Sequence, residues 1–293
     1  MANLKEIRNR ISSVNSTMQI TSAMKMVSAA KLKRAQDAIT QMRPYAEKLQ
    51  EILSNVSSTL DSSEGIYSQE RELKNVLFVA VTSNRGLCGG FNNNVVKLIN
   101  AESNKEKYAN AQISILPIGK KAKDAFKNSG KLYNGSVINN ELEGLWDDLN
   151  FGNVSEVAEQ IMTTFVDGAY DEVVICYNKF KNATVQELMA EPFLPLLPSQ
   201  EEEETTSTDY IFEPNKETIV EDLIPKSLKV QLYKAMLDSR ASEHGARMTA
   251  MHKATDNASE LKSDLTLHYN KVRQAAITNE ILEIVGGAEA LNN

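Results

Sequence analysis

The sequence contains few cysteines and no long apolar run. Its two cysteines, Cys88 and Cys176, give no disulfide framework and fit a reducing compartment. No stretch approaches the roughly 18 apolar residues that a membrane-spanning helix needs. The first residues, MANLKEIRNRISS, lack the apolar segment of a secretory signal. We therefore expect a folded protein, with one large domain or two in 293 residues, and neither a disulfide-rich secreted domain nor a membrane span.

Proline and glycine are also scarce at both ends of the chain. The first proline is Pro44 and the first glycine is Gly65. From Lys226 to Val285 there is no proline and a single glycine, Gly245. Because both residue types disfavour the interior of a helix, their scarcity allows one long helix at each end.

An apolar repeat with alternating steps of three and four residues runs through the N-terminal region. This repeat is typical of a coiled-coil seam, and only Thr21, Lys25 and Ser28 interrupt it. Because the repeat continues past Pro44, we expect a kink there and not the end of the helix. The seam positions are Leu4, Ile7, Ile11, Val14, Met18, Leu32, Ala35, Ile39, Met42, Ala46, Leu49, Leu53, Val56 and Leu60.

The C-terminal region, residues 226–285, shows a similar pattern. Large apolar residues such as Leu228, Leu232, Leu261 and Leu265 recur at three- and four-residue steps. Two helices of similar length at opposite ends of one chain predict an antiparallel pair, brought together by the part that folds between them. A parallel pair is the alternative, and it would require the middle of the chain to span the full length of the helices. Between the apolar positions lies a zone of small residues, namely Ala235, Ser239, Ser242, Gly245, Ala246 and Thr249.

The middle of the chain has an α/β pattern. Its apolar runs are typical of strands that are buried on both faces, and helical patterns fall between them, which predicts a mostly parallel sheet covered by helices. The order of the strands stays open. The acidic segment PSQEEEETTSTDYIFEPNKE follows and predicts an exposed loop or linker. The expected strands are 74–83, 113–119, 172–178 and, less clearly, 183–189; the expected helices are 92–108, 120–128 and 154–166.

These patterns predict an α/β fold joined to a long antiparallel coiled coil of the N- and C-terminal helices. We expect three parts: an N-terminal helix at 1–72, a central α/β domain at 73–210 with the acidic loop at its end, and a C-terminal helix at 211–293.

The net charge of −7 is unevenly distributed. Residues 1–50 contain nine Lys and Arg against three Asp and Glu, whereas residues 51–220 contain 14 against 26. A basic end on an acidic chain suggests an acidic partner for that end. A solvated helix face without a partner explains the charges equally well.

The loop TSNRGLCGGFNNN (82–94) follows the first expected strand and precedes a helix, where phosphate-binding loops lie. Its glycine spacing fits neither the P-loop nor the dinucleotide-binding fingerprint, so a tight turn is the alternative. Cys88 in this loop would need a basic partner to act as a nucleophile. The structural interpretation of this residue is a buried, unreactive thiol. The histidines all lie on the C-terminal helix, which we expect to be distant, and their spacing does not suit a zinc site; they are His244, His252 and His268.

The basic cluster Lys31, Lys33 and Arg34 could contact nucleic acid, as a coiled-coil arm. No aromatic residue is interleaved with the cluster, and the chain is acidic overall, which argues against this function. Residue chemistry alone therefore leaves open a coiled-coil scaffold, a nucleic-acid-binding arm on an α/β domain, or an α/β enzyme with a helical arm.

Three segments resemble the gamma subunit of F-type ATP synthases. They are ITSAMKMVSAAKLKRAQ near the start, SNRGLCGGFN after the first expected strand and ITNEILEIVGGAEAL at the end, and they occur in the order of that family. The last segment is the strongest match. Its family pattern is Ile-Thr-x-Glu-x-x-acid-x-x-x-Gly-Ala-x-small, and this chain supplies Ile277, Thr278, Glu280, Glu283, Gly287, Ala288 and Ala290.

The resemblance implies a central rotor subunit. In the family, the two terminal helices form a coiled coil inside a ring of three alpha and three beta subunits. A Rossmann-like middle domain lies against the membrane c-ring and the epsilon subunit. Proton or sodium flow turns the c-ring and the shaft, and the shaft drives the three beta sites in turn through binding, synthesis and release of ATP; hydrolysis runs the machine backwards.

The resemblance also implies that this chain is not itself an enzyme and holds no catalytic, cofactor-binding or metal-binding residue. It implies no nucleic-acid partner. The expected location is the cytoplasmic face of a bacterial inner membrane, where the chain is attached indirectly through the c-ring. The residues expected to bind the partner subunits are Met24, Lys25, Met26, Lys31, Lys33, Arg34, Ile277, Thr278, Glu280, Glu283, Gly287 and Ala288.

A rotor explains why the segment MKMVSAAKLKRAQDAITQM is helical yet poor in large apolar side chains. A rotating helix must not bind its surroundings much more tightly at one angle than at others. A fully buried Leu contributes about 1.5–3 kcal/mol, whereas small residues, flexible Met and mobile Lys make weaker contacts that can re-form at each angle. Close packing of the two helices on each other is the alternative explanation.

Overall fold

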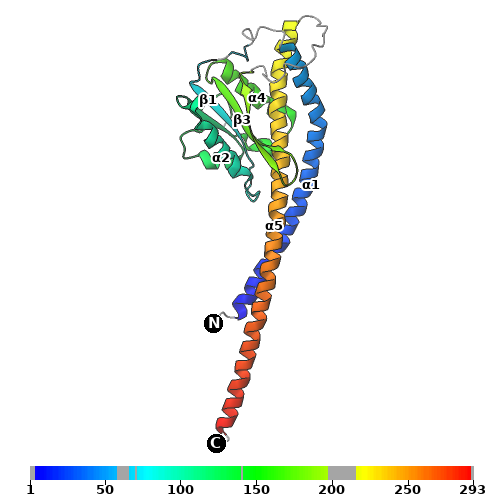
Figure 1. The fold of residues 1–293 in the computed structure, drawn as a ribbon, viewed down its shortest axis with the longest axis vertical. Coiled ribbons are helices and arrows are strands. Elements are labelled where there is room, and N and C mark those ends of the chain that lie inside the picture. The colour runs from blue at the N-terminus through cyan, green and yellow to red at the C-terminus, as the bar shows by residue number, and fades with distance from the viewer. Residues whose placement is uncertain (1–3, 58–65, 70, 140, 197–215, 292–293) are drawn as a thin grey trace. The chain divides into compact units, whose positions relative to one another are not determined.

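The computed structural model describes residues 4–57, 66–69, 71–139, 141–196 and 216–291. The chain divides into two compact units, which are described separately below. Unit 1 comprises residues 1–28 and 248–293, and unit 2 comprises residues 29–247. Two long helices, α1 (Leu4–Ser57) and α5 (Lys216–Leu291), contribute to both units (Figure 1).

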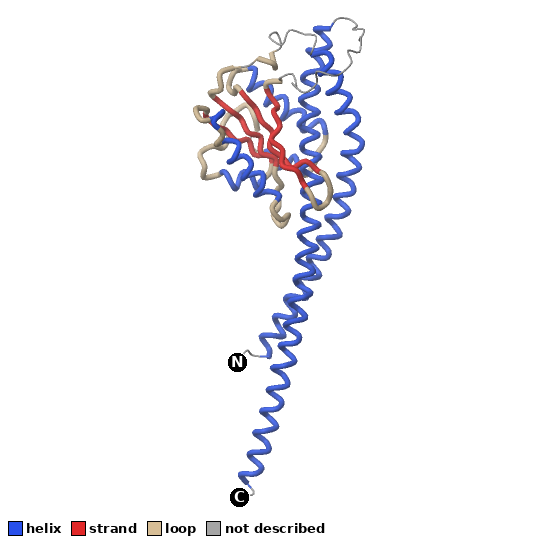
Figure 2. Tube along the Cα trace, viewed as in Figure 1, coloured by secondary structure: helices blue, strands red, loops and turns tan. Residues whose placement is uncertain are grey.

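Unit 2 contains a four-stranded sheet in the order β2-β1-β3-β4 (Figure 2). The first three of these strands are parallel, and β4 runs antiparallel to β3, which confirms a mostly parallel sheet. The less clear fourth strand exists, although it begins three residues later than expected. The strands are β1 (Asn75–Val81), β2 (Gln112–Ile118), β3 (Glu172–Phe180) and β4 (Gln186–Leu194).

Three α-helices cover the sheet together with α5: α2 (Phe91–Ser103), α3 (Lys120–Phe126) and α4 (Phe151–Val166). The helix predicted at 92–108 is longer than the one observed. Helix α2 ends at Ser103, and Glu106–Tyr108 forms a separate 3-10 helix. Lys105 between them has extended backbone, which cannot continue an α-helix. A second 3-10 helix, Leu142–Trp146, precedes α4.

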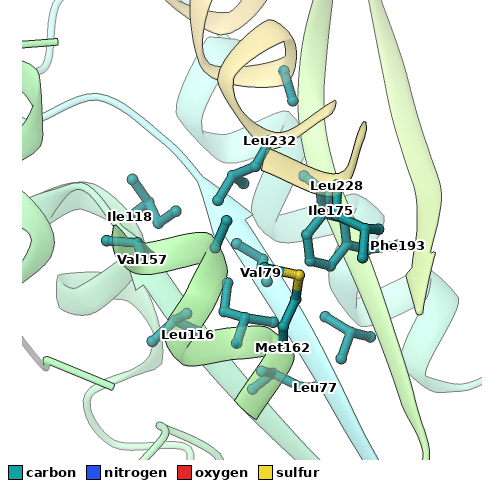
Figure 3. Packing of buried hydrophobic residues seen from close by; sticks show 14 of the residues in the cluster. Leu77, Val79, Leu116, Ile118, Val157, Met162, Ile175, Phe193, Leu228 and Leu232 are labelled. Carbon is teal, nitrogen blue, oxygen red and sulfur yellow. The ribbon is translucent and has the colours of Figure 1, made fainter. Parts of the chain in front are cut away.

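Both faces of the sheet are buried, as the continuous apolar run of β1 predicts. Alternate residues of β1 belong to different clusters: Leu77 and Val79 pack with α4 and α5, whereas Val76 and Phe78 pack with α2 and α3. Figure 3 shows the first cluster, in which side chains of α5 lie among those of the sheet and α4. The α5 residues in this core are Ile224, Leu228, Leu232, Ala235 and Met236.

The part of α1 in unit 2 packs on α5 through the predicted seam. Ala46 and Leu49 of α1 form a small buried cluster with Val230 of α5. The helix continues past Pro44, as expected. Helix α5 begins at Lys216, five residues after the start of the predicted C-terminal part (211–293), and contains Pro225. Proline removes one backbone hydrogen bond of a helix, but packing of the buried residues Ile224 and Leu228 on either side retains the helical path.

Unit 1 is an antiparallel pair of helices. Arg8 Nη2 donates to Tyr269 OH at 2.8 Å, and Lys262 Nζ donates to Asn15 Oδ1 at 2.8 Å. These two pairs fix the antiparallel direction that the sequence predicts, because later residues of α1 meet earlier residues of α5. The polar seam positions Thr21 and Ser28 are buried like the apolar position Ile7, so the register continues through them.

Candidate functional site

The C-terminal tip of α5 extends beyond its partner helix in unit 1. Because Arg8 lies level with Tyr269 and the helices are antiparallel, α1 residues from Leu4 onward reach only to about residue 273 of α5. From Ile277 to Ala288 every residue is exposed. Among the described residues, this tip therefore does not pack on α1.

The exposed tip is rich in large apolar side chains. Leu282 is 63% exposed and Ile284 is 72% exposed, and Ile281 and Val285 are exposed to similar degrees. A helix in water is expected to carry such residues on one face only, and contiguous exposed apolar surface marks an interaction site. The six expected partner-binding residues of this tip all lie on its exposed surface: Ile277, Thr278, Glu280, Glu283, Gly287 and Ala288.

The N-terminal helix carries the other expected binding residues. In unit 1, Met26 is 65% exposed, whereas Met24 and Lys25 are half-buried. The sequence-based selection missed two exposed apolar neighbours of Met26, namely Ile20 and Val27. Their seven-residue spacing places them on one helix face, and that spacing is the signal that could have found them.

In unit 2, Lys31, Lys33 and Arg34 are exposed on one turn of α1, while Leu32 and Ala35 between and beside them are buried in the seam. Lys33 Nζ lies 2.8 Å from Asp37 Oδ1. Such an exposed pair contributes about 0–1 kcal/mol, so it leaves this lysine able to exchange its partner. The turn offers an exposed positive surface.

The glycine loop after β1 is a tight turn held by side chains. Asn92 Oδ1 accepts hydrogen bonds from the backbone N–H of Ser83 at 2.9 Å and from its hydroxyl at 3.0 Å. Gly89 has φ of +59°, which favours glycine, but Leu87 also has a positive φ, of +62°. The left-handed conformation at Leu87 has no sequence signal.

Cys88 lies in this loop and is buried. Burial raises the pKa of its thiol, and nearby Arg247 only partly offsets this effect. A thiol kept protonated is a poor nucleophile, which fits the structural interpretation of this residue.

The expectation that the C-terminal helix lies far from this loop is wrong. Arg247 of α5 donates hydrogen bonds to the backbone oxygens of Gly86 and Arg85, and to Glu243 Oε1 at 2.5 Å. Helix α5 lies against the loop because its core side chains pack into the sheet about three to six turns before Arg247. No local sequence pattern encodes this tertiary arrangement.

His244 on α5 is buried, and its Nδ1 has no hydrogen-bond partner among the described residues. Burial lowers its pKa to about 4, and the nearby charges of Lys31, Arg240 and Arg247 act in the same direction. His252 and His268 are exposed.

In the described parts of the chain, no three His, Cys, Asp or Glu side chains gather in a way that could hold a metal ion. None of the described helices is long and apolar enough to cross a membrane.

Comparisons with known proteins cover nearly the whole chain. Residues 3–291 match the protein family described as ATP synthase. The ATP synthase gamma chain of Flavobacterium johnsoniae is 60% identical over all of both chains, and that of Flavobacterium psychrophilum is 60% identical over 99% of each. A chain in the solved Euglena gracilis mitochondrial ATP synthase, OSCP/F1/c-ring in rotational state 3, has 25% identity and a TM-score of 0.69, covering 98% of this chain and 94% of that one.

Proposed function

This chain belongs to the ATP synthase gamma chain family, and we propose that it is the central-stalk rotor subunit of an F-type ATP synthase. In this function it transmits torque between the ion-driven c-ring in the membrane and the catalytic alpha/beta hexamer, during ATP synthesis or hydrolysis. The observation that carries the proposal is the 60% identity to gamma chains over the full length. The scaffold, nucleic-acid and enzyme alternatives have no comparable support.

The partners are the alpha and beta subunits, the epsilon subunit and the c-ring. The exposed tip of α5 in unit 1 supports contact with an apolar sleeve of the hexamer, because Leu282 and Ile284 would be removed from water there. The exposed turn with Lys31, Lys33 and Arg34 supports contact with acidic segments of the beta subunits. Exposed charge pairs of about 0–1 kcal/mol can form and break as the shaft turns.

The chain acts without catalysing a reaction itself, and ATP chemistry belongs to the beta subunits. The protonated thiol of buried Cys88 supports this part of the proposal. The chain is a peripheral protein on the cytoplasmic face of a bacterial inner membrane, attached through the c-ring. We assign it three working parts: an N-terminal part (1–72) that contains α1, a central α/β part (73–210) and a C-terminal part (211–293) that contains α5. The acidic loop lies outside the described residues.

Co-expression with the alpha, beta and epsilon subunits of the same organism tests this function. A tag on this chain is expected to recover all three in one complex with ATPase activity, while this chain alone has none. Turnover by the isolated chain, or its recovery without alpha and beta, would refute the proposal. RNA or DNA binding that falls steeply with salt would instead favour the nucleic-acid alternative.

A further inference from the structure

The hairpin that joins β3 to β4 lies against one face of α5 in unit 2 (Figure 2). Ser242 Oγ donates a hydrogen bond to the backbone oxygen of Asn178 at 3.0 Å. One turn further along, a Cβ atom at Gly245 would lie 3.1 Å from the backbone oxygen of Ala183 and 3.2 Å from its Cα. The hairpin backbone therefore touches the backbone of the helix, with no side chain between them.

One turn before Ser242, a third residue of the same face is also buried. Asp238 is 2% exposed, and its Oδ1 has no hydrogen-bond partner among the described residues. Its carboxyl is near the backbone N–H of Phe180 in the hairpin and near Arg43 of α1. Positions 238, 242 and 245 follow the i, i+4, i+7 spacing of one helix face, so three successive turns of α5 face the hairpin.

This face accepts the hairpin at only one rotation of α5 about its own axis. Neighbouring residues in a helix are about 100° apart. Rotation by one residue would direct the long side chain of Glu243 or the ring of His244 toward the hairpin, where a single Cβ at Gly245 already makes a tight contact. By contrast, the apolar packing of Leu228 and Leu232 on the sheet is non-directional. It holds α5 in place without fixing its rotation as strictly.

We propose that this contact between α5 and the β3–β4 hairpin is the joint through which torque passes from the α/β part of unit 2 to α5, with Gly245 and Ser242 as positioning residues. The inference rests on the rotor function proposed above. For the α/β part to turn α5 without slipping, the joint must resist rotation of the helix relative to that part. A contact between two backbones resists it better than one through flexible side chains, which can change rotamer.

The test uses the complete ATP synthase in sealed vesicles, with Gly245→Leu, Gly245→Ala and Ser242→Ala in this chain. The control is Gly144→Leu, because no atom lies within 4 Å of a Cβ at that glycine. Two quantities are measured: hydrogen exchange of the hairpin amides, and coupling ions (protons or sodium) pumped per ATP hydrolysed. Overpacking in Gly245→Leu is expected to raise hairpin exchange about fivefold or more and to lower the pumping ratio, with smaller effects in the other two variants and none in the control.

If a variant shows faster hairpin exchange but an unchanged pumping ratio, the proposal that torque passes through this contact is wrong. Unchanged exchange in all three variants would overturn it as well, because the contact would then not depend on these residues. Should Gly245→Leu fail to assemble, the milder Gly245→Ala and Ser242→Ala decide in the same way. Failure of the unaltered chain to assemble with its partners would instead contradict the proposed function, so the two failures are distinct.

Discussion

Thr21 and Thr255 lie 234 residues apart in the sequence, yet their hydroxyl oxygens are 2.8 Å apart in unit 1. Thr255 Oγ1 is also 2.8 Å from the backbone oxygen of Met251, and the Thr21 hydroxyl donates to that of Met18 at 3.1 Å. Thr21, which interrupts the apolar repeat of α1, therefore makes a polar contact with α5 across the helix pair. Polar contacts of this kind fix the register of a coiled coil while contributing less stability than apolar packing.

Replacing Thr21 and Thr255 by valine tests how much their contact contributes to the stability of the folded chain. Thr21→Val is expected to lower the free energy of unfolding by about 1 kcal/mol or less, because Thr255 keeps Met251 as an acceptor. The double variant with Thr255→Val is expected to cost less than the sum of the two single changes, as two apolar side chains then face each other. Urea unfolding of the purified chain gives these values. Thr17→Val is the control, since that threonine is exposed; an equal effect there would contradict a special contribution of the pair.

Removal of residues 277–293 is expected to weaken assembly with alpha and beta subunits and to leave the α/β part of unit 2 intact. The physical reason is that the apolar side chains Leu282 and Ile284 are exposed on the tip, so a partner that removes them from water stabilises the complex. Co-purification through a tag on this chain measures assembly, and circular dichroism of the isolated chain measures folding. The point variant Leu282→Ser keeps the helix length and should show part of the effect. Unchanged co-purification after truncation would count against the sleeve contact.

Neutralising the basic turn of α1 is expected to weaken binding to the hexamer modestly. The combined change Lys31→Gln, Lys33→Gln and Arg34→Gln removes three exposed positive charges, each expected to change affinity about fivefold or less. The salt dependence of binding should decrease at the same time, because screened charge contacts are lost. The control variant changes Lys97 and Lys127, two exposed lysines of the α/β part, to Gln. If both variants bind with identical salt dependence, the basic turn has no acidic partner.

The buried ring of His244 is expected to make the folded chain less stable in mild acid. Because the pKa of this buried ring is about 4 in the folded chain and near 6.5 when exposed, the unfolded chain binds an extra proton between these values. Stability from this residue is thus complete above about pH 6.5 and is lost as pH falls toward 4, by about 2–3 kcal/mol. Urea unfolding at several pH values measures it. His244→Gln should flatten this part of the profile, whereas the exposed His252→Gln should not; equal profiles for all three chains would refute the assignment.

The sequence alone determined the elements whose cause is local. Continuous apolar strands such as β1 follow from the residues themselves, because burial on both faces requires apolar side chains at every position. The α1 seam follows from a repeat that matches the helical period. The motif at the end of α5 was enough to predict the family, and the full-length relatives confirm that prediction.

Tertiary structure decided the contacts between segments distant in sequence. The strand order, the antiparallel direction of β4, the packing of Leu228 and Leu232 into the sheet and the contact of Arg247 with the glycine loop depend on how separate elements meet. The small residues Ser242 and Gly245 show the difference most clearly. Their size is visible in the sequence, but only the folded chain shows that part of this zone receives the β3–β4 hairpin, since a short side chain creates space without specifying what fills it.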